Sequence, residues 1–222
     1  MNNLLIVANL KSYKTENEAK EWLENFKKIK EPGQNLENKE IVICPSFTLL
    51  SLFSLYISDN NLPVKIGAQN TSPFDEGAYT GEVNAKQIKD FADFVLIGHS
   101  ERRNNFGETD DMLSKKTELS LKYGLTPIFL VQGKDNLIPQ EIKIIAYEPI
   151  FAIGSGNPDT PENANQIASL IKSKNNIYQI LYGGSVTSEN VKSFTGMVNI
   201  SGVLVGGASL DPEELIKIIK NA

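Results

Sequence analysis

Glu148 is the first side chain in this sequence that suggests chemistry, because of the segment that surrounds it. It follows a short apolar run that predicts a β-strand, and Pro149 then prevents the strand from continuing. The small apolar tip after it ends in Gly154 and Gly156, a composition typical of a lid that folds over a ligand. A carboxylate held rigidly beside such a lid could serve as a base. The alternative interpretation is a buried strand followed by an ordinary loop.

Two cationic or titratable side chains also follow apolar runs. Lys11 comes after the run at residues 4–8 and could supply positive charge, although alone it would be interpreted as a solvated surface lysine. His99 follows the run at 94–97 and a glycine, at the start of an expected helix. This position favours a role as an electrophile over that of a hydrogen-bonded structural histidine.

Glycine-rich turns follow the last two apolar runs. The sequence YGGS at 182–185 and the sequence GGAS at 206–209 would expose backbone N–H groups, and a helix start after such a turn favours a bound anion. Each alone would be an ordinary loop or a tight turn. Together with Lys11, His99 and Glu148 they form a set suited to proton transfer on a phosphorylated substrate.

The elements that must position these residues alternate between β-branched apolar runs and segments with helical periodicity. The expected strands lie at residues 4–8, 41–44, 64–68, 94–97, 127–131, 142–147, 177–181 and 203–205. The expected helices lie at residues 16–30, 49–57, 85–91, 109–123, from 161 onward, 189–194 and from 212 to near 220. Thr160, Thr187 and Asp211 are the expected caps of the last three helices.

Eight such units predict an α/β fold of the (β/α)8 barrel type, with an open doubly wound sheet as the alternative. Because no linker or low-complexity segment interrupts the alternation, we expect a single domain over residues 1–222. Only about ten residues, 132–141, separate the fifth and sixth runs. We therefore expect the helix after strand five to be reduced or missing. In such a barrel the site lies at the C-terminal ends of the strands.

Composition excludes several classes of protein. The chain has 222 residues and a net charge of −5, which gives no basic footprint for nucleic acid. Cys44 is the only cysteine and His99 the only histidine, so neither an intramolecular disulfide nor a multi-histidine or cysteine metal site is expected. No apolar run has the length of a signal peptide core or a membrane span. We expect a cytoplasmic protein without membrane contact.

Six motifs, in one order, resemble the triosephosphate isomerase family from end to end. They are AN-L-K ending at Lys11, GAQN with GAYTGEV within 67–83, IGHSERR at 97–103, AYEPIFAIGSG at 146–156, YGGSV at 182–186 and VGGASL at 205–210. The resemblance implies interconversion of dihydroxyacetone phosphate and D-glyceraldehyde 3-phosphate through an enediolate, in glycolysis and gluconeogenesis. It also implies that no metal or organic cofactor takes part.

The resemblance further implies a role for individual residues. Glu148 would be the base, a neutral His99 the electrophile, and Lys11 the group that stabilises the anion. Glu101 would support the site, and Thr80, in the loop 71–81, would reach the partner's site in a homodimer. The implied substrate-binding residues are Asn9, Lys11, Gly154, Ser185, Gly206 and Gly207.

The chain departs from the family pattern in four places. Residues 130–133 read LVQG where the family usually has Cys-x-Gly-Glu, which leaves a supporting carboxylate in doubt. The helix after strand five is largely missing. Phe151 replaces the usual lid tryptophan, and Asn157-Pro158 stands where the family commonly has a lysine and small residues. Because proline fixes φ, we expect a stiffer end to the lid.

Two other functions stay open at this stage. A different phosphosugar isomerase on the same barrel would share the phosphate loops, but it would not need both His99 and Glu148 in these contexts. A catalytically silent barrel could bind sugar phosphates as a sensor. The presence of Lys11 together with the other two argues against that second possibility.

Overall fold

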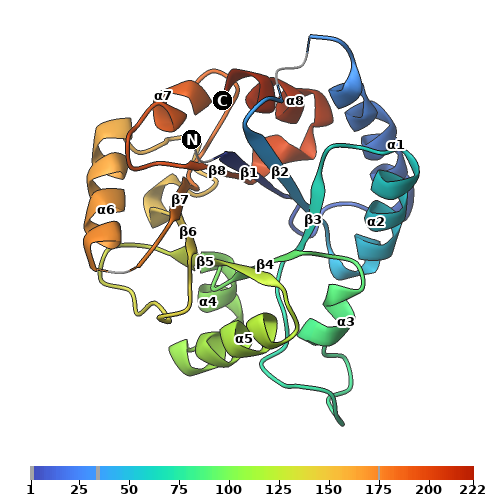
Figure 1. The fold of residues 1–222 in the computed structure, drawn as a ribbon, viewed down its shortest axis with the longest axis vertical. Helices are drawn as coiled ribbons and strands as arrows, with labels where there is room; N and C mark the ends of the chain where they lie inside the picture. The colour runs from blue at the N-terminus through green and yellow to red at the C-terminus, as the bar shows by residue number, and fades with distance from the viewer. Residues whose placement is uncertain (1–2, 34–35, 175) are drawn as a thin grey trace.

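Eight parallel strands pair in chain order and close into a barrel, because β8 pairs back onto β1 (Figure 1). The computed structural model describes residues 3–33, 36–174 and 176–222. The strands are β1 Leu4–Asn9, β2 Lys39–Cys44, β3 Lys65–Ala68, β4 Phe94–Ile97, β5 Thr126–Val131, β6 Ile144–Tyr147, β7 Gln179–Tyr182 and β8 Gly202–Val205. The predicted (β/α)8 class is confirmed, and the open doubly wound sheet is wrong.

The strands form here because both of their faces are apolar. In β1, Leu5 and Val7 belong to a cluster inside the barrel, whereas Ile6 and Ala8 face the layer of helices outside it. Successive side chains of a strand point to opposite faces, so a strand buried on both sides must be continuously apolar. This pattern is what made the strands recognisable in the sequence.

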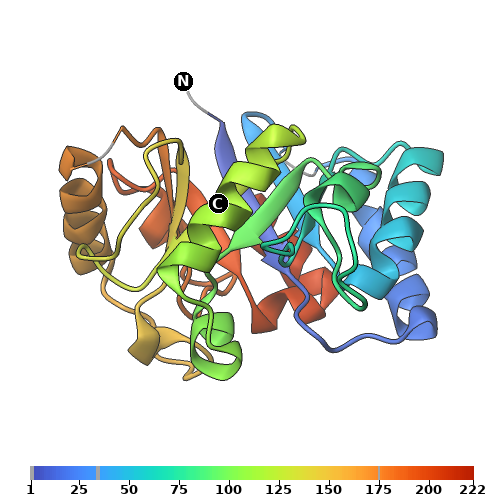
Figure 2. The same ribbon diagram turned by 90° about the horizontal axis from the view of Figure 1, so that it is seen from below.

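Helices surround the barrel, and the turns that lead to the site lie at one end of it. In Figure 2, α4 and the segment near residue 150 lie at one end, and the N-terminus lies at the other. The α-helices are α1 Glu16–Phe26, α2 Leu50–Asp59, α3 Ala85–Lys89, α4 Ser100–Phe106, α5 Asp110–Lys122, α6 Pro161–Lys174, α7 Val191–Thr195 and α8 Pro212–Asn221. The 3-10 turns are η1 Lys27–Lys30, η2 Phe47–Leu49, η3 Ile150–Ala152 and η4 Gly207–Leu210.

Two of the three expected helix caps, Asp211 and Thr160, are confirmed, and each lies directly before its helix. Asp211 caps α8 through Glu213 N, and Thr160 accepts a hydrogen bond from Asn163 N at the start of α6. The expected cap at Thr187 is wrong. The helix α7 has Asn190 at its N-cap, because a turn separates Thr187 from it, and Asn190 Oδ1 accepts the N–H of Thr187 at 2.9 Å.

The connection between β5 and β6 contains no helix in residues 132–143, all of which the structure describes. Instead, Asn136 Oδ1 accepts the backbone N–H groups of Gln132 and Gly133, both at 3.0 Å. Ile142 is buried and anchors the return to the barrel. The expected loss of this helix is therefore confirmed.

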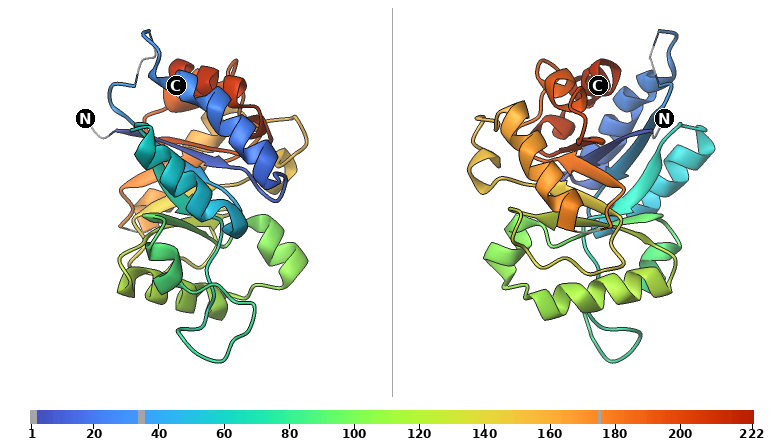
Figure 3. Two further views of the ribbon diagram at one scale, coloured as in Figure 1. Left: turned by 90° about the vertical axis from the view of Figure 1, so that its right-hand side faces the viewer. Right: turned by 60° about the vertical axis from the view of Figure 1, so that its left-hand side comes forward.

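The loop 71–81 projects away from the barrel, as the teal segment in both views of Figure 3 shows. Its base is buried at Thr71 and Ser72. Its tip carries Phe74 stacked on Tyr79, with ring centroids 4.3 Å apart and both side chains partly exposed. In the ranges that the structure describes, no helix is long and apolar enough to cross a membrane.

Candidate active site

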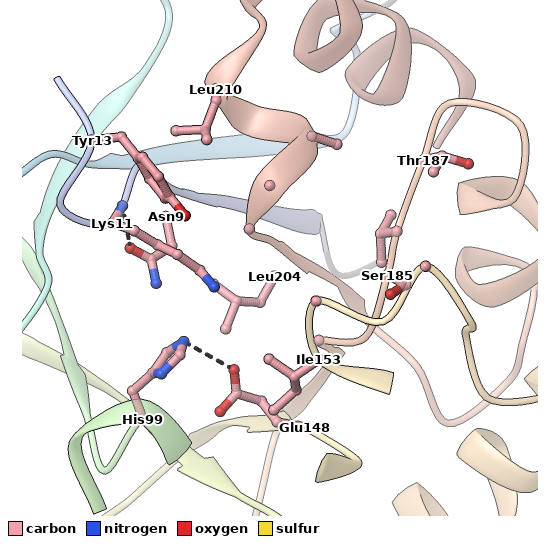
Figure 4. A pocket seen from close by; sticks show the side chains of 17 residues that line it. Asn9, Lys11, Tyr13, His99, Glu148, Ile153, Ser185, Thr187, Leu204 and Leu210 are labelled. Carbon is pink, nitrogen blue, oxygen red and sulfur yellow. Dashed lines mark hydrogen bonds and ion pairs between the residues drawn. The ribbon is translucent and has the colours of Figure 1, made fainter. Parts of the chain in front are cut away.

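A cavity of about 330 Å³ lies at the C-terminal ends of the strands (Figure 4). It brings together every residue that was predicted to be catalytic or to bind substrate. These residues are Asn9, Lys11, His99, Glu148, Gly154, Ser185, Gly206 and Gly207. Glu101 lines a neighbouring hollow instead, and Thr80 lies on the exposed loop, away from this cavity within the single chain.

Lys11 reaches the cavity from a strained backbone position just after β1. Its φ of 52° lies in the left-handed region, which costs a non-glycine residue about 1–2 kcal/mol. Two hydrogen bonds hold it there, from Lys11 N to Asn9 Oδ1 at 3.0 Å and from Gln69 Nε2 to the Lys11 carbonyl at 2.8 Å. Lys11 Nζ forms an ion pair with Glu101 Oε1 at 2.5 Å. The surrounding structure therefore fixes the ammonium group at the cavity wall.

His99 is fixed by the start of α4. It occupies the N-cap position, where its Nδ1 accepts the backbone N–H of Glu101 at 3.2 Å. A ring nitrogen that accepts a hydrogen bond carries no proton, so this geometry suits the neutral ring with its proton on Nε2. Burial lowers the pKa of His99. The Glu101 carboxylate opposes this effect, and the charges of Lys11 and Arg102 add to it.

Glu148 is buried at the end of β6 and faces His99. Its Oε1 lies 3.2 Å from His99 Nε2, and its Oε2 accepts the backbone N–H of Ser100 at 3.3 Å. Burial raises the pKa of this carboxyl, and the hydrogen bond from Ser100 opposes the increase only in part. A desolvated carboxylate with a raised pKa is a stronger base than one in water.

The turn after β8 closes the other side of the cavity. A Cβ atom on Gly206 would lie 3.3 Å from Lys11 Cε, so a larger residue here would press on the lysine. Ser209 Oγ donates to the Gly206 carbonyl at 2.6 Å and is also 3.1 Å from the Asn9 carbonyl, which ties β8 to β1. Gly207 begins η4 at the cavity, where the first backbone N–H groups of a helical turn are common ligands of an anion.

The segment 149–157, here called the lid, forms a third side of the cavity through Ile153, Gly154 and Gly156. Ile150 and Phe151 at its tip are 60% and 62% exposed, whereas Ala152 is buried and its carbonyl accepts Ser185 Oγ at 2.6 Å. Gly154 and Gly156 have φ values of 66° and 76°, a region that glycine enters without strain.

The far end of the lid is held on the barrel. Asp159 N donates to Tyr182 Oη at 2.7 Å, and the Asp159 carboxylate accepts two contacts from Asn163 Nδ2. Pro158 precedes this buried attachment point directly.

The residues that replace the family's Cys-x-Gly-Glu pattern take structural positions. Leu130 packs inside the barrel, and Gly133 offers no side chain that could stand in for the usual carboxylate. Gln132 Oε1 accepts only a long contact from Asn136 Nδ2, at 3.4 Å.

Several residues of the site were not singled out from the sequence. Ser100 donates its backbone N–H to Glu148, and Gln69 donates its side-chain amide to the Lys11 carbonyl. Both lie within motifs in which other residues were proposed as functional. Leu204 and Leu210 are apolar wall residues that no pattern distinguishes from the core, whereas Ile153 belongs to the apolar tip expected to form the lid. Tyr13 also lines the cavity, and only its position two residues after Lys11 could have suggested this.

The closed parallel barrel and a carboxylate–histidine pair facing an anion-sized cavity define an α/β-barrel enzyme that moves protons. Comparison with known proteins gives the particular family. The family model described as triosephosphate isomerase matches residues 4–137 and 134–222. The chain therefore belongs to the triosephosphate isomerase family, and it is an isomerase.

Curated relatives agree over the whole chain. A triosephosphate isomerase from Dictyoglomus turgidum is 39% identical over 254 residues, covering 100% of both chains. Those from Trichodesmium erythraeum and Aquifex aeolicus are 38% and 39% identical. These two alignments cover 99% and 97% of this chain, and 99% and 98% of the relatives.

Proposed function

We propose that the protein interconverts dihydroxyacetone phosphate and D-glyceraldehyde 3-phosphate through an enediolate, with Glu148 as the base. The contact of 3.2 Å between Glu148 Oε1 and His99 Nε2 carries this proposal. It puts a buried base and a neutral hydrogen-bond donor side by side at a cavity that Lys11 also lines. Such a group of residues suits removal of a proton next to a carbonyl.

Proton abstraction falls to Glu148. A C–H bond next to a carbonyl is only weakly acidic, so the base must be close, oriented and poorly solvated. The carboxylate is 3% exposed, and its raised pKa brings it nearer to the pH at which the enzyme works. It takes the proton from one carbon and returns it to the neighbouring carbon, so that the base is regenerated in each turnover.

Stabilisation of the enediolate falls to His99 and Lys11. When substrate enters, its oxygen replaces Glu148 Oε1 as the acceptor of the Nε2 proton, and the carboxylate is freed to face the substrate carbon. The neutral ring gives its Nε2 proton to the oxygen that becomes negative and takes the hydroxyl proton of the neighbouring oxygen in return, so the ring ends each turnover neutral. The Lys11 ammonium group offsets the developing negative charge. Asn9 holds the lysine backbone, and Glu101 holds its side chain.

The phosphate group lies at the glycine-rich turns in this proposal. Gly206 and Gly207 offer backbone N–H groups, and Ser185 and Gly154 approach from the β7 turn and the lid. Closure of the lid excludes water, which protects the enediolate from losing its phosphate. The reaction needs neither a metal ion nor an organic cofactor.

We propose that the active unit is a homodimer in which the loop 71–81 of one protomer enters the other. A second hollow of about 300 Å³, lined by Lys11, His99, Glu101 and Phe106 among others, lies on the outer side of the catalytic residues. Phe106 is 67% exposed in the single chain. The loop is already held in shape, because Tyr123 Oη donates to Asp75 Oδ1 at 2.6 Å. Thr80 is then the residue that reaches the partner's site.

The setting of the reaction follows from its substrates. Triose phosphates are intermediates of glycolysis and gluconeogenesis, so the proposed location is the cytoplasm. We also propose that residues 1–222 fold as one domain, because the last strand, β8, closes the barrel by pairing with the first strand, β1. A single cooperative thermal transition is the expected result for that unit.

A coupled assay tests the proposed activity. Purified protein is given glyceraldehyde 3-phosphate, and dihydroxyacetone phosphate is reduced by an auxiliary dehydrogenase. Rapid turnover is expected from the natural protein. Binding of inorganic phosphate without turnover would instead favour a silent phosphate-binding barrel.

A further inference from the structure

Tyr13 is an aromatic residue that stands at the rim of the active-site cavity and that the proposed mechanism does not use. It is 66% exposed, yet it lines the cavity together with Gly207, Ala208 and Leu210. Figure 4 draws the ring reaching from the rim inward, on the side of the cavity that holds Asn9. Because the ring lines the cavity and is exposed, it is free to contact a molecule that enters there.

The backbone on both sides of Tyr13 is fixed. Lys11 is held by Asn9 and Gln69, as described above. On the other side, Lys14 Nζ donates to the Leu210 carbonyl at 3.1 Å, which attaches this segment to the turn after β8. Thr15 then caps α1, where its N–H and hydroxyl both bind Glu18. The backbone at Tyr13 therefore belongs to a short, anchored connection, which places the side chain at the rim of the cavity near the turn after β8.

The residues of the turn after β8 that line this side of the cavity carry no side-chain donor, and the neighbouring Lys11 ammonium group is already paired with Glu101. Gly206, Gly207, Ala208 and Leu210 can offer only backbone N–H groups to an anion. A phenol hydroxyl can donate a hydrogen bond to a phosphate oxygen without adding charge. Its ring meanwhile presents an apolar surface that can keep water from the bound group.

We infer that Tyr13 is a further substrate-binding residue, whose hydroxyl donates to the phosphate group and whose ring covers that group on the side opposite the lid. This inference rests on the proposed function. It adds a wall from the β1 loop to the walls formed by the turns after β7 and β8. Because the contact is to a part of the substrate that does not react, it is present in the ground state and the transition state alike.

Tyr13→Phe tests the hydroxyl while leaving the ring in place. We expect KM to rise about fivefold, as for loss of one partly exposed hydrogen bond, with kcat unchanged. The inhibition constant of inorganic phosphate should rise by the same factor. Tyr13→Ala should increase both further, because the covering ring is lost as well.

Tyr178→Phe is the matched control. Tyr178 is 61% exposed, and it lies just before β7, at the opposite end of the strand from the cavity. We expect this variant to keep the KM and phosphate inhibition of the natural protein. Equal thermal transitions in all three variants would show that each one is folded.

Two results would overturn the inference. One is an unchanged KM and an unchanged phosphate inhibition constant in Tyr13→Phe. The other is an increase in KM that disappears at protein concentrations high enough to restore the dimer, since Tyr13 would then be an interface contact. Absence of turnover in the natural protein would contradict the proposed function instead, and direct titration with inorganic phosphate would still test Tyr13.

Discussion

At the scale of single residues, the site depends on the different partners of the two ring nitrogens of His99. Nδ1 of His99 accepts the Glu101 N–H, and Nε2 faces Glu148. Because Nδ1 is already an acceptor, a proton added there would lose this hydrogen bond and would face the N-terminus of α4. Backbone geometry and burial therefore act in the same direction, toward the neutral ring.

The first prediction concerns the charge of His99. We expect its pKa to lie below the ordinary value of 6.5, so the ring stays neutral throughout the working range of pH. NMR titration is unambiguous, since the chain has a single histidine. A protonation midpoint at or above 6.5 would contradict this account of the electrophile.

The second prediction concerns Glu148. Burial raises its pKa above 4.5, so the carboxylate is present above the raised pKa and is lost as the pH falls through it. Turnover that needs the carboxylate is lost in the same direction. Carbon-13 NMR titration of the glutamate carboxyl groups, with Glu148→Gln for assignment, measures the midpoint. A midpoint at or below 4.5 would show that burial does not control this group.

At the scale of elements, the lid is the segment that must change shape, and its two ends differ. The glycines at 154 and 156 already have positive φ, whereas the chain after Pro158 is attached to the barrel by Asp159. A residue before proline is restricted to extended conformations, which also limits Asn157. Rotation during closure should therefore concentrate on the glycines and on the side near Pro149.

The third prediction compares two lid variants. Gly156→Ala places a Cβ atom at a φ of 76°, which costs about 1–2 kcal/mol of strain, and it should lower kcat and change KM together. Pro158→Ala should change the rate of lid opening but not the proton-transfer step. Relaxation-dispersion NMR measures opening. Equal opening rates in the natural protein and in Pro158→Ala would mean that Pro158 only shapes the start of α6.

The sequence predicted elements well where the cause was local or periodic. The strands were recognisable because runs such as Phe94–Ile97 are apolar on both faces. The missing helix after β5 was recognisable from the length of the connection. The cap at Thr187 failed because the turn before α7 depends on Asn190 folding back onto it. Tyr13 was missed because its place depends on Lys14 reaching Leu210, 196 residues away.

At the scale of the whole molecule, a single chain leaves apolar surface beside the proposed catalytic residues. Phe74, Tyr79 and Phe106 are all exposed, and Phe106 lines the second hollow together with Lys11 and His99. The loop 71–81 has internal order but projects from the barrel (Figure 3). Association of two copies would bury these surfaces and fix Lys11 and His99 from outside.

The fourth prediction tests this association. Thr80→Arg should produce monomers with weak activity, because the added charge would have to enter the partner's hollow. Val198→Arg, at a loop residue that is 87% exposed, is the control and should stay dimeric. Sedimentation at micromolar concentration gives the assembly state. A natural protein that sediments as a fully active monomer would contradict the dimer.

The central claim is that Glu148 transfers a proton between two carbons of a triose phosphate. The most direct measurement is NMR of product formed from dihydroxyacetone phosphate in D₂O, by the natural protein and by Glu148→Gln. From the natural protein we predict glyceraldehyde 3-phosphate that carries deuterium at C2 in those turnovers in which the Glu148 carboxyl proton exchanges with D₂O before it is returned, and protium at C2 in the others. The variant should form it more slowly by a factor of about 10² or more, with phosphate affinity retained. A variant within tenfold of the natural rate would contradict the account.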